Sequence, residues 1–329
     1  MQNKEYKHIR AYRCGAVLAV ADRLFTMPYL RYWADKTTAG VEAKGLEHVT
    51  PDKGHLFLTN HRDIVLDPAW LTWILRTRLN IRPYIAMGNN LFGRWWIEPF
   101  VRLNRAFVVI RDGGLHEQLE HSRTLSRYIR DRIEEKHSVW MAQREGRAKD
   151  SNDLTQPAVL KMLIMSANGT DDVEALKALN ICPVSLSYEY DPCDYLKAAE
   201  MQLKRDNPDW HKSPEDDIRS MRTGIEGYKG RVVFHFTPSI NPWLDEQHEA
   251  LNAMTRQERL QAIAHRIDWQ IHSHYEVFDR GTDFETYLQE RLQQIDLPNK
   301  DEAFLMDRLR EMYNNPVVNY EKSHLSGEF

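Results

Sequence analysis

The run Phe57-Leu58-Thr59-Asn60-His61-Arg62-Asp63-Ile64-Val65-Leu66-Asp67-Pro68 decides how the rest of this chain is interpreted. Its apolar start is typical of a buried strand, and the apolar spacing after Pro68 is typical of a helix. Asp67-Pro68 predicts the helix start, with Asp67 as N-cap and Pro68 as first residue, because Asp can accept a bond from a free helix N–H and proline needs none. His61 then lies in the connecting turn.

A histidine in such a turn can act as a general base. A neutral imidazole can accept a proton from a bound hydroxyl while a carboxylate fixes its tautomer. Asp67 is one candidate for this carboxylate, and Asp63 is the other. The simpler interpretation is that Asp67 only caps the helix and that His61 is an ordinary turn residue.

A second polar segment follows a predicted strand. The apolar run 139–142 leads into Gln143-Arg144-Glu145-Gly146-Arg147-Ala148-Lys149-Asp150. A glycine lets backbone N–H groups approach an anion, and an arginine side chain offers a planar fork to phosphate oxygens. This loop is therefore a candidate phosphate site, and a solvated charged turn is the alternative.

These segments resemble, in order, the sequence blocks of the glycerophosphate and lysophosphatidate acyltransferase superfamily. Asn60-His61 and Asp67-Pro68 resemble the Asn-His-x4-Asp block, although five residues separate His61 from Asp67 here. Glu145-Gly146-Arg147 resembles the Glu-Gly-x-Arg block, although Arg147 follows the glycine directly. Residues 93–111 resemble the second block, which ends on an arginine, here Arg111, and residues 181–188 resemble the Val-Pro-Val strand.

The resemblance implies an acyltransferase of the 1-acyl-sn-glycerol-3-phosphate acyltransferase type. His61 and Asp67 would form the catalytic pair, and helix N–H groups near Pro68 would hold the oxyanion. Four residues would bind the acceptor's phosphate, namely Glu145, Gly146, Arg147 and Arg111. The donor would be acyl-CoA or acyl-carrier protein, the acceptor a phosphate-bearing lysolipid or glycerophosphate, and no cofactor or metal would be needed.

Two other functions stay open. The acceptor could be a lyso-aminolipid, because a single sequence does not define the acceptor pocket. The chain could also be a lipid-binding or regulatory protein of the same fold that has lost catalysis, which the extra residue between His61 and Asp67 favours. The set His265, Asp268 and His272 has helical spacing, but such sets are common on histidine-rich helices, and we expect no metal there.

Composition is compatible with an enzyme that works beside a membrane. The 329 residues are 42% hydrophobic and 28% charged, with a mean hydropathy of -0.61 and a net charge of -4, so nothing favours nucleic acid as a partner. No run approaches the roughly 18 apolar residues of a spanning helix. Three cysteines without metal-binding spacing indicate a reduced, cytoplasmic setting, and we expect a peripheral location on the inner face of the membrane.

Alternating patterns predict an α/β fold, and the resemblance implies a glycerol-3-phosphate acyltransferase-like mixed sheet flanked by helices. We expect three regions: an N-terminal amphipathic helical segment (1–40), an acyltransferase domain (41–240) and a helical C-terminal extension (241–329). Within them the first helix should span about 8–25, residues 200–228 should form a surface insertion, and residues 244–274 should form one or two helices broken near Thr255. The predicted strands are 41–46, 55–58, 82–87, 106–110, 138–142, 181–188 and 231–236.

Overall fold

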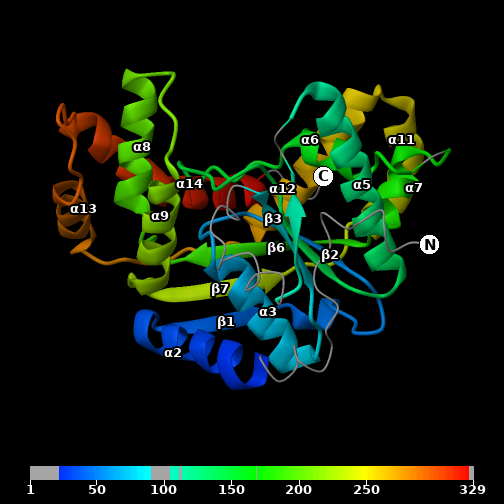
Figure 1. Cartoon of the computed structure of the whole chain (residues 1–329), viewed down its shortest axis with the longest axis horizontal. Coiled ribbons are helices and arrows are strands. Elements are labelled where there is room, and N and C mark those ends of the chain that lie inside the picture. Colours follow the sequence, from blue (N-terminus) through cyan, green and yellow to red (C-terminus); the bar gives the residue numbers. More distant parts are fainter. Residues whose placement is uncertain (1–21, 90–103, 111–112, 168, 326–329) are drawn as a thin grey trace.

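The computed structural model describes residues 22–89, 104–110, 113–167 and 169–325. Seven strands form one mixed sheet in the order β1-β7-β6-β2-β5-β3-β4 (Figure 1). Neighbouring strands are parallel, except that β7 runs antiparallel to β6. The strands are β1 (Gly40–Lys44), β2 (Leu56–Thr59), β3 (Tyr84–Gly88), β4 (Ala106–Val109), β5 (Val139–Ala142), β6 (Ile181–Tyr188) and β7 (Arg231–Phe236).

All seven predicted strands are confirmed to within two residues at each end, and so is the α/β class. The central strand β2 is buried along its whole length, because parallel neighbours on both edges and helices on both faces surround it. Its side chains alternate between the two faces. Leu56 and Leu58 join the core on one face, and Phe57 joins the core on the other.

Helices cover both faces of the sheet (Figure 1). On one face lie α2 (Met27–Thr37) and α3 (Leu66–Leu79), whose Trp70, Leu71 and Leu75 are fully buried. Burial of each such leucine contributes about 1.5–3 kcal/mol. The opposite face packs against α5 (Leu115–Glu134), α6 (Pro157–Leu163), α7 (Asp172–Lys177), α10 (Asn241–Glu246), α11 (His248–Ala253) and α12 (Arg256–Ser273).

A third layer of helices stands at one end of the sheet. It contains α8 (Asp194–Asp206), α9 (Pro214–Glu226), α13 (Phe284–Gln293) and α14 (Glu302–Leu325). Apolar residues of α13 and α14 pack with Ala198 of α8 in a separate small core. Residues 200–228, predicted as a surface insertion, therefore include most of two helices. Ser213 caps α9 by accepting a bond from the N–H of Asp216, whose carboxylate accepts the Ser213 N–H in return.

The N-terminal segment is mainly helical where the structure describes it. The predicted helix over 8–25 falls mostly outside the described residues. A short π-helix, η1 (Asp22–Thr26), leads into α2, which lies within the region 1–40 predicted as helical but beyond the predicted helix over 8–25. Toward the other end, the predicted break near Thr255 is confirmed, because Thr255 caps α12 with Glu258 as its reciprocal partner.

Gly224, in the last turn of α9, allows this helix to approach the turn after β2. A Cβ atom at position 224 would lie 1.9 Å from Oδ2 of Asp63, which is far inside any allowed contact. Because Asp63 is itself buried, neither the helix nor the turn has free space into which it could move. The glycine therefore determines how closely the third layer of helices packs on the sheet.

We predict that Gly224→Ala destabilises the protein, although Gly→Ala inside a helix ordinarily gains about 1 kcal/mol. The clash with Asp63 should outweigh this gain and cost about 1–3 kcal/mol, as overpacking does. Urea unfolding measures the change. Gly114→Ala is the control, because a Cβ there meets nothing within 4 Å and φ is -70°. A Gly224→Ala protein as stable as wild type would contradict this account.

Candidate active site

Three neighbouring parallel strands bring the predicted residues to one edge of the sheet. In the order β6-β2-β5, the carboxyl ends of these strands lie side by side. Tyr188 ends β6, His61 follows β2, and Arg147 lies in the loop after β5. Ligands of open α/β sheets bind at this kind of edge. The topology therefore explains why segments more than 120 positions apart meet in one site.

His61 and Asp67 form a direct pair. Nδ1 of His61 lies 2.8 Å from Oδ2 of Asp67, and the exposed fraction of the His61 side chain is 13%, whereas that of Asp67 is zero. Since a carboxylate oxygen accepts, Nδ1 donates and Nε2 keeps its lone pair. The ring also packs edge-on against Trp140 of β5, at 5.7 Å between ring centroids. This arrangement suits an oriented general base.

Asp67 holds the turn as well as the imidazole. Its Oδ2 also accepts the backbone N–H groups of Arg62 (2.6 Å) and Asp63 (2.9 Å), and its Oδ1 accepts the hydroxyl of Tyr188 (2.8 Å). The prediction of Asp67 as N-cap is wrong, because α3 begins two residues earlier than predicted, at Leu66, after Val65 as N-cap. The Asp67 side chain instead turns back onto the loop.

Asp63 performs the capping role that was predicted for Asp67. Its Oδ1 accepts the N–H groups of Val65 (2.8 Å) and Leu66 (2.7 Å) at the start of α3. Burial, and then the neighbouring Asp67, raise the pKa of Asp63 above its ordinary value. The geometry thus pairs His61 with Asp67 rather than with Asp63, and the turn accommodates the extra residue.

The same contacts correct the expected oxyanion site. The N–H groups of Arg62 and Asp63 are bound by Asp67, and those of Val65 and Leu66 are bound by Asp63. An oxyanion hole at the start of α3 cannot use these four donors. These N–H groups already donate hydrogen bonds to the two carboxylates. The bonds fix the turn, and they leave none of the four donors for a ligand.

Asn60 and Arg62 anchor the turn to distant segments. The Asn60 side chain exchanges two hydrogen bonds with the backbone of Leu186 in β6. The buried Arg62 lies 2.5 Å from Oδ2 of Asp153, and the same oxygen accepts the Tyr275 hydroxyl (2.7 Å). Sequence reasoning missed both Asp153 and Tyr275, which follow the candidate phosphate loop and α12. No local pattern marks them.

The three residues predicted in the candidate phosphate loop do not share one environment, because two are exposed and one is buried. Glu145 and Gly146 are exposed, and Gly146 has a φ of +67°, a conformation that favours glycine. Arg147 turns inward and is only 7% exposed, and its Nη1 has no hydrogen-bond partner. A buried guanidinium nitrogen without a partner suits an anionic ligand. Arg111, the fourth predicted ligand, lies outside the described residues.

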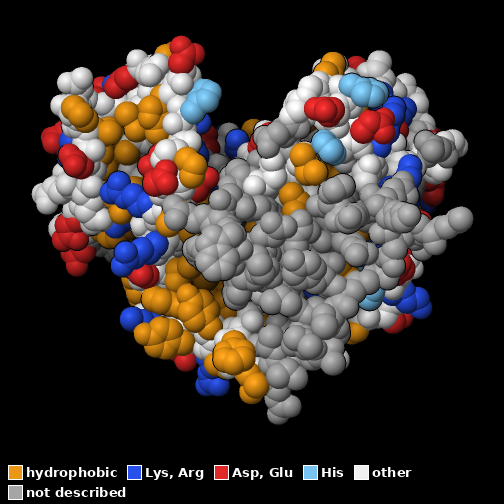
Figure 2. Space-filling model, viewed as in Figure 1, with side chains coloured by type: hydrophobic (Ala, Val, Ile, Leu, Met, Phe, Trp, Pro, Cys, Tyr) orange, Lys and Arg blue, Asp and Glu red, His pale blue; other side chains and the backbone are white. Residues whose placement is uncertain are grey.

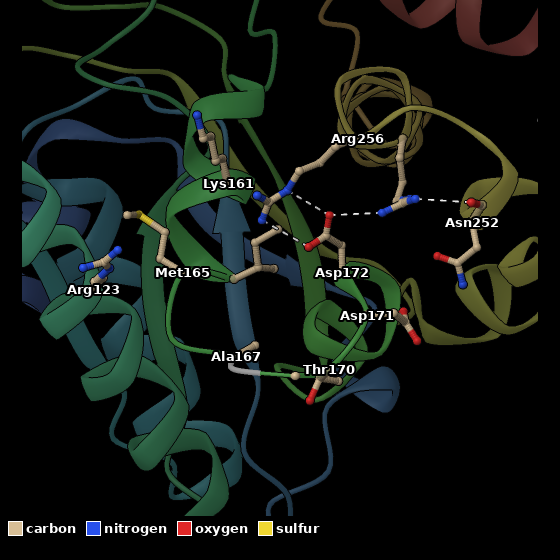
Figure 3. A pocket seen from close by; sticks show the side chains of 12 residues that line it. Arg123, Lys161, Met165, Ala167, Thr170, Asp171, Asp172, Asn252 and Arg256 are labelled. Atoms are coloured by element: carbon tan, nitrogen blue, oxygen red, sulfur yellow. Dashed lines mark hydrogen bonds and ion pairs between the residues drawn. The ribbon is translucent and has the colours of Figure 1, made fainter.

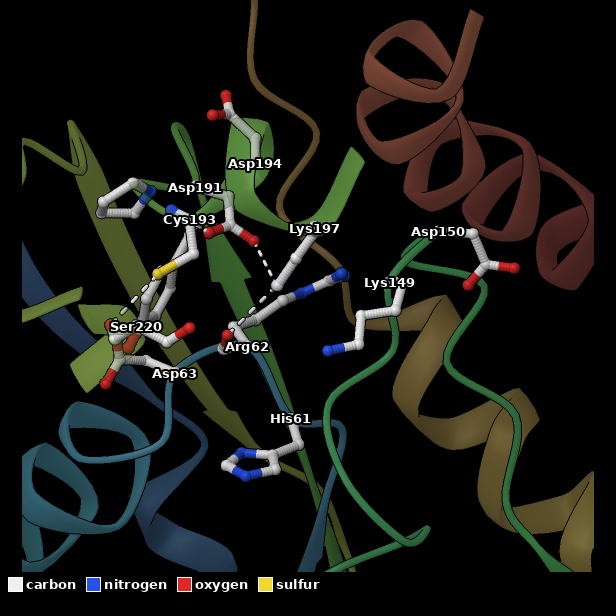
Figure 4. Close-up of polar contacts among 12 residues, drawn as sticks. His61, Arg62, Asp63, Lys149, Asp150, Asp191, Cys193, Asp194, Lys197 and Ser220 are labelled. Atoms are coloured by element: carbon white, nitrogen blue, oxygen red, sulfur yellow. Dashed lines mark hydrogen bonds and ion pairs between the residues drawn. The ribbon is translucent and has the colours of Figure 1, made fainter. Parts of the chain in front are cut away.

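Two lysines, Lys149 and Lys197, lie near this part of the site (Figure 4). Lys197 of α8 is almost fully buried and binds Oδ2 of Asp191 at 2.5 Å and the carbonyl of Arg62 at 3.2 Å. Lys149, on the loop after β5, binds Glu200 of α8 at 2.5 Å. Sequence reasoning assigned no role to either lysine. Both belong to ion pairs with α8 or the segment before it, which no short motif could reveal.

Two other features lie away from this edge. A cavity of about 640 Å³ lies between α5, α6, α7 and α11, lined in part by Arg123, Lys161 and Asp172 (Figure 3), and it contains none of the predicted site residues. The set considered for a metal does not converge, because His265 is exposed whereas Asp268 is buried against Thr155. No three His, Cys, Asp or Glu side chains in the described ranges are placed to hold a metal.

Within the part of the chain that the structure describes, no helix is long and apolar enough to cross a membrane. Apolar side chains nevertheless gather on the surface over η1 and α2 (Figure 2). The exposed fractions are 60% for Leu24, 71% for Phe25, 49% for Tyr29 and 53% for Tyr32. We call these four residues the α2 patch.

Comparison with known proteins agrees with the sequence blocks. Residues 40–187 match the family model described as Acyltransferase. Four chains of solved structures match, among them the 1-acyl-sn-glycerophosphate acyltransferase PlsC from Thermotoga maritima, at 10% identity and a TM-score of 0.38, covering 73% of this chain and 89% of that one. No curated protein matches. The match to the Acyltransferase family model covers just under half of the chain and includes His61, Asp67 and Arg147, which lie at one edge of the sheet.

Proposed function

We propose that this protein transfers a fatty acyl group from a thioester donor, acyl-CoA or acyl-carrier protein, to a hydroxyl of a phosphate-bearing lysolipid or glycerophosphate. The observation that carries the proposal is the His61–Asp67 pair, in which the buried Asp67 binds Nδ1 of a partly exposed imidazole and leaves Nε2 as the basic nitrogen. The match of residues 40–187 to the Acyltransferase family model supports the reaction class.

In the proposed reaction, Nε2 of His61 accepts the proton of the acceptor's hydroxyl as its oxygen attacks the thioester carbonyl. Asp67 stabilises the imidazolium that forms. The carbon–sulfur bond then breaks, and the thiolate takes the proton from His61, so that the base is restored. The proton that His61 accepts from the hydroxyl thus ends on the leaving thiol, and the proposed reaction needs no acyl-enzyme intermediate, metal or organic cofactor.

The main alternative was a lipid-binding protein that had lost catalysis. Its support was the extra residue between His61 and Asp67. The 2.8 Å contact between Nδ1 and Oδ2 supports the catalytic proposal instead, because the longer turn still brings the two side chains together. A lyso-aminolipid acceptor remains the other option, and it would leave the unpartnered nitrogen of Arg147 without an evident use.

The defining experiment is an acyl-transfer assay on the purified full chain. Radiolabelled acyl-CoA and acyl-carrier protein serve as donors, with matched lysolipids that carry or lack a phosphate as acceptors. We expect transfer to the phosphate-bearing acceptors. Transfer only to aminolipids would replace the acceptor in the proposal, and absence of transfer to every acceptor would favour the lipid-binding alternative.

We predict that His61→Ala lowers kcat/KM by about 10²–10⁴ with little change in Tm, since the side chain is partly exposed and makes one hydrogen bond. Asp67→Asn should lower both turnover and Tm, because it also holds two loop N–H groups and Tyr188. Asp63→Asn should affect turnover least. Rates and melting curves are measured together, and a larger loss of rate for Asp63→Asn than for Asp67→Asn would reassign the carboxylate.

A second prediction concerns the acceptor. Arg147→Ala should raise the KM of a phosphate-bearing acceptor roughly thirtyfold, since loss of a charge-assisted bond costs on the order of 2 kcal/mol. The KM of the donor is the internal control and should stay within about twofold. Equal losses for acceptor and donor would mean that Arg147 supports the loop rather than the phosphate.

We also propose that the protein acts from the cytoplasmic face of a membrane, as a peripheral protein attached through its N-terminal region. The α2 patch supports this proposal, because four large apolar side chains exposed on consecutive helical turns suit an interface. Lys36 lies over the rings of Tyr32 and Trp33, which places a cation at the edge of the patch. The buried free thiols of Cys182 and Cys193 suit a reducing compartment.

Liposome flotation tests this attachment. Leu24→Ser with Phe25→Ser should weaken binding to anionic vesicles at least tenfold, because each large apolar side chain contributes about 1.5–3 kcal/mol when buried. Salt should also weaken binding, through the basic residues near the patch. Met254→Ser, which alters an exposed apolar residue between α11 and α12, is the matched control. Binding unchanged by the double substitution would exclude the α2 patch.

A further inference from the structure

The two oxygens of the Asp67 carboxylate have different partners. Oδ2 accepts the imidazole of His61 and two N–H groups of the turn. Among the described residues, only the hydroxyl of Tyr188 donates to Oδ1, at 2.8 Å. Tyr188 lies 121 positions further along the chain, at the end of β6. One tyrosine therefore compensates alone for the burial of one carboxylate oxygen.

The phenol of Tyr188 is held rigidly under the turn. Tyr188 is only 8% exposed, and its ring centroid lies 6.2 Å from that of Trp70 on α3. Leu66, the first residue of α3, belongs to the same core cluster. The backbone of Tyr188 pairs with Val232 of β7 in the sheet. Because this core is close-packed, the hydroxyl has no free space in which to turn away from Asp67.

The long turn after β2 gives this contact its importance. Five residues separate His61 from Asp67, and Asp67 is the second residue of α3. A carboxylate in the first turn of a helix ordinarily faces the free N–H groups of that helix, which attract negative charge. Asp67 instead points back to His61. The hydroxyl of Tyr188 binds Oδ1 and leaves Oδ2 for the imidazole, so it fixes which oxygen faces His61.

The charges around the phenol keep it a hydrogen-bond donor. Burial, and then the charges of Asp67 and Asp63, raise the pKa of Tyr188 well above its ordinary value, and Asp191 acts in the same direction. Lys229 is buried in the same part of the fold, but its ammonium binds backbone carbonyls. Tyr188 therefore keeps its proton throughout the neutral range. A hydroxyl that donates to a carboxylate stabilises the ionised form of that carboxylate.

We propose that Tyr188 is a positioning residue of the acyl-transfer reaction, because its hydroxyl keeps Asp67 ionised and aimed at Nδ1 of His61. The proposal rests on the proposed function, in which His61 is the general base. It extends the pair to three residues and gives the end of β6 a part in the chemistry. Tyr188 acts through Asp67 and does not itself contact the imidazole in this arrangement.

Tyr188→Phe removes the hydroxyl and keeps the ring. Without the hydroxyl, Oδ1 of Asp67 lacks a partner, and the carboxylate holds the protonated imidazole of His61 more tightly. His61 then stays protonated, and inactive as a base, up to a higher pH. We expect kcat at neutral pH to fall about ten- to a hundredfold, with both KM values within about twofold. The acid limb of the pH–kcat profile should move up by about one unit.

Tyr287→Phe is the matched control. The hydroxyl of Tyr287, on α13, donates to Oδ2 of the buried Asp194 at 3.0 Å, so this substitution also removes a bond from a tyrosine to a buried aspartate. Asp194 belongs to the third layer of helices and makes no printed contact with the turn after β2. We expect Tyr287→Phe to keep the wild-type kcat and acid limb, whatever its effect on Tm.

A chemical probe reports the state of His61 without acyl transfer. Diethyl pyrocarbonate modifies an imidazole only when the attacking nitrogen is unprotonated, and peptide mass spectrometry identifies the modified His61. The pH profile of this modification should move up in Tyr188→Phe, as the profile of kcat does. Tyr188→3-fluorotyrosine, introduced at this one position, keeps the bond and makes the hydroxyl a stronger donor. It should move both profiles to lower pH.

Two results would overturn the proposal. The first is a Tyr188→Phe protein whose profiles of kcat and of His61 modification keep the wild-type acid limb. The second is an equal fall of kcat in Tyr287→Phe, which would reduce the effect to general loss of a buried hydroxyl. If Tyr188→Phe does not fold, unchanged profiles of the fluorotyrosine protein overturn the proposal instead. A wild-type chain without acyl transfer, combined with the expected shift in His61 modification, would contradict the proposed function alone.

Discussion

The carboxylate of Asp67 is the contact on which this site depends. It is fully buried and accepts four hydrogen bonds, from the imidazole of His61, two turn N–H groups and the hydroxyl of Tyr188. Burial of a carboxylate is unfavourable unless hydrogen bonds compensate for lost hydration. The groups that donate these hydrogen bonds are the His61 imidazole, the turn that carries it and Tyr188. The same hydrogen bonds therefore stabilise the turn and orient the imidazole.

Patterns in the sequence predict local structure, but they do not show which distant segments contact each other. The seven strands follow from patterns within about a dozen residues, and the same short range offers Asp63 and Asp67 as the two candidate partners of His61 without deciding between them. The N-cap assignment of Asp67 failed because Asp-Pro has the same pattern whether the carboxylate caps the helix or turns back, and the position of Asp63 decides between them. Helices α8 and α9 were missed because their polar composition resembles a loop, although Ser213-Pro214 with Asp216 was a usable capping signal.

Partners such as Tyr188, Tyr275 and Glu200 could not be predicted from one sequence. Periodicity shows which face of an element is buried, but it does not show which residue of another element lies opposite. The contacts Tyr188–Asp67, Tyr275–Asp153 and Lys149–Glu200 join residues 121, 122 and 51 positions apart. They depend on sheet order and on the packing of the third layer of helices, and both are properties of the complete fold.

The contact of Arg62 with Asp153 and Tyr275 has a consequence for synthesis of the chain. The ribosome makes His61 and Asp67 more than 200 residues before Tyr275, and α14, whose Asn315 and Asn319 bind the backbone of Asp150 and Asn152, comes later still. During most of translation the buried charge of Arg62 lacks its complete set of partners. The turn after β2 therefore gains its complete set of contacts only after the segments from α12 to α14 have left the ribosome.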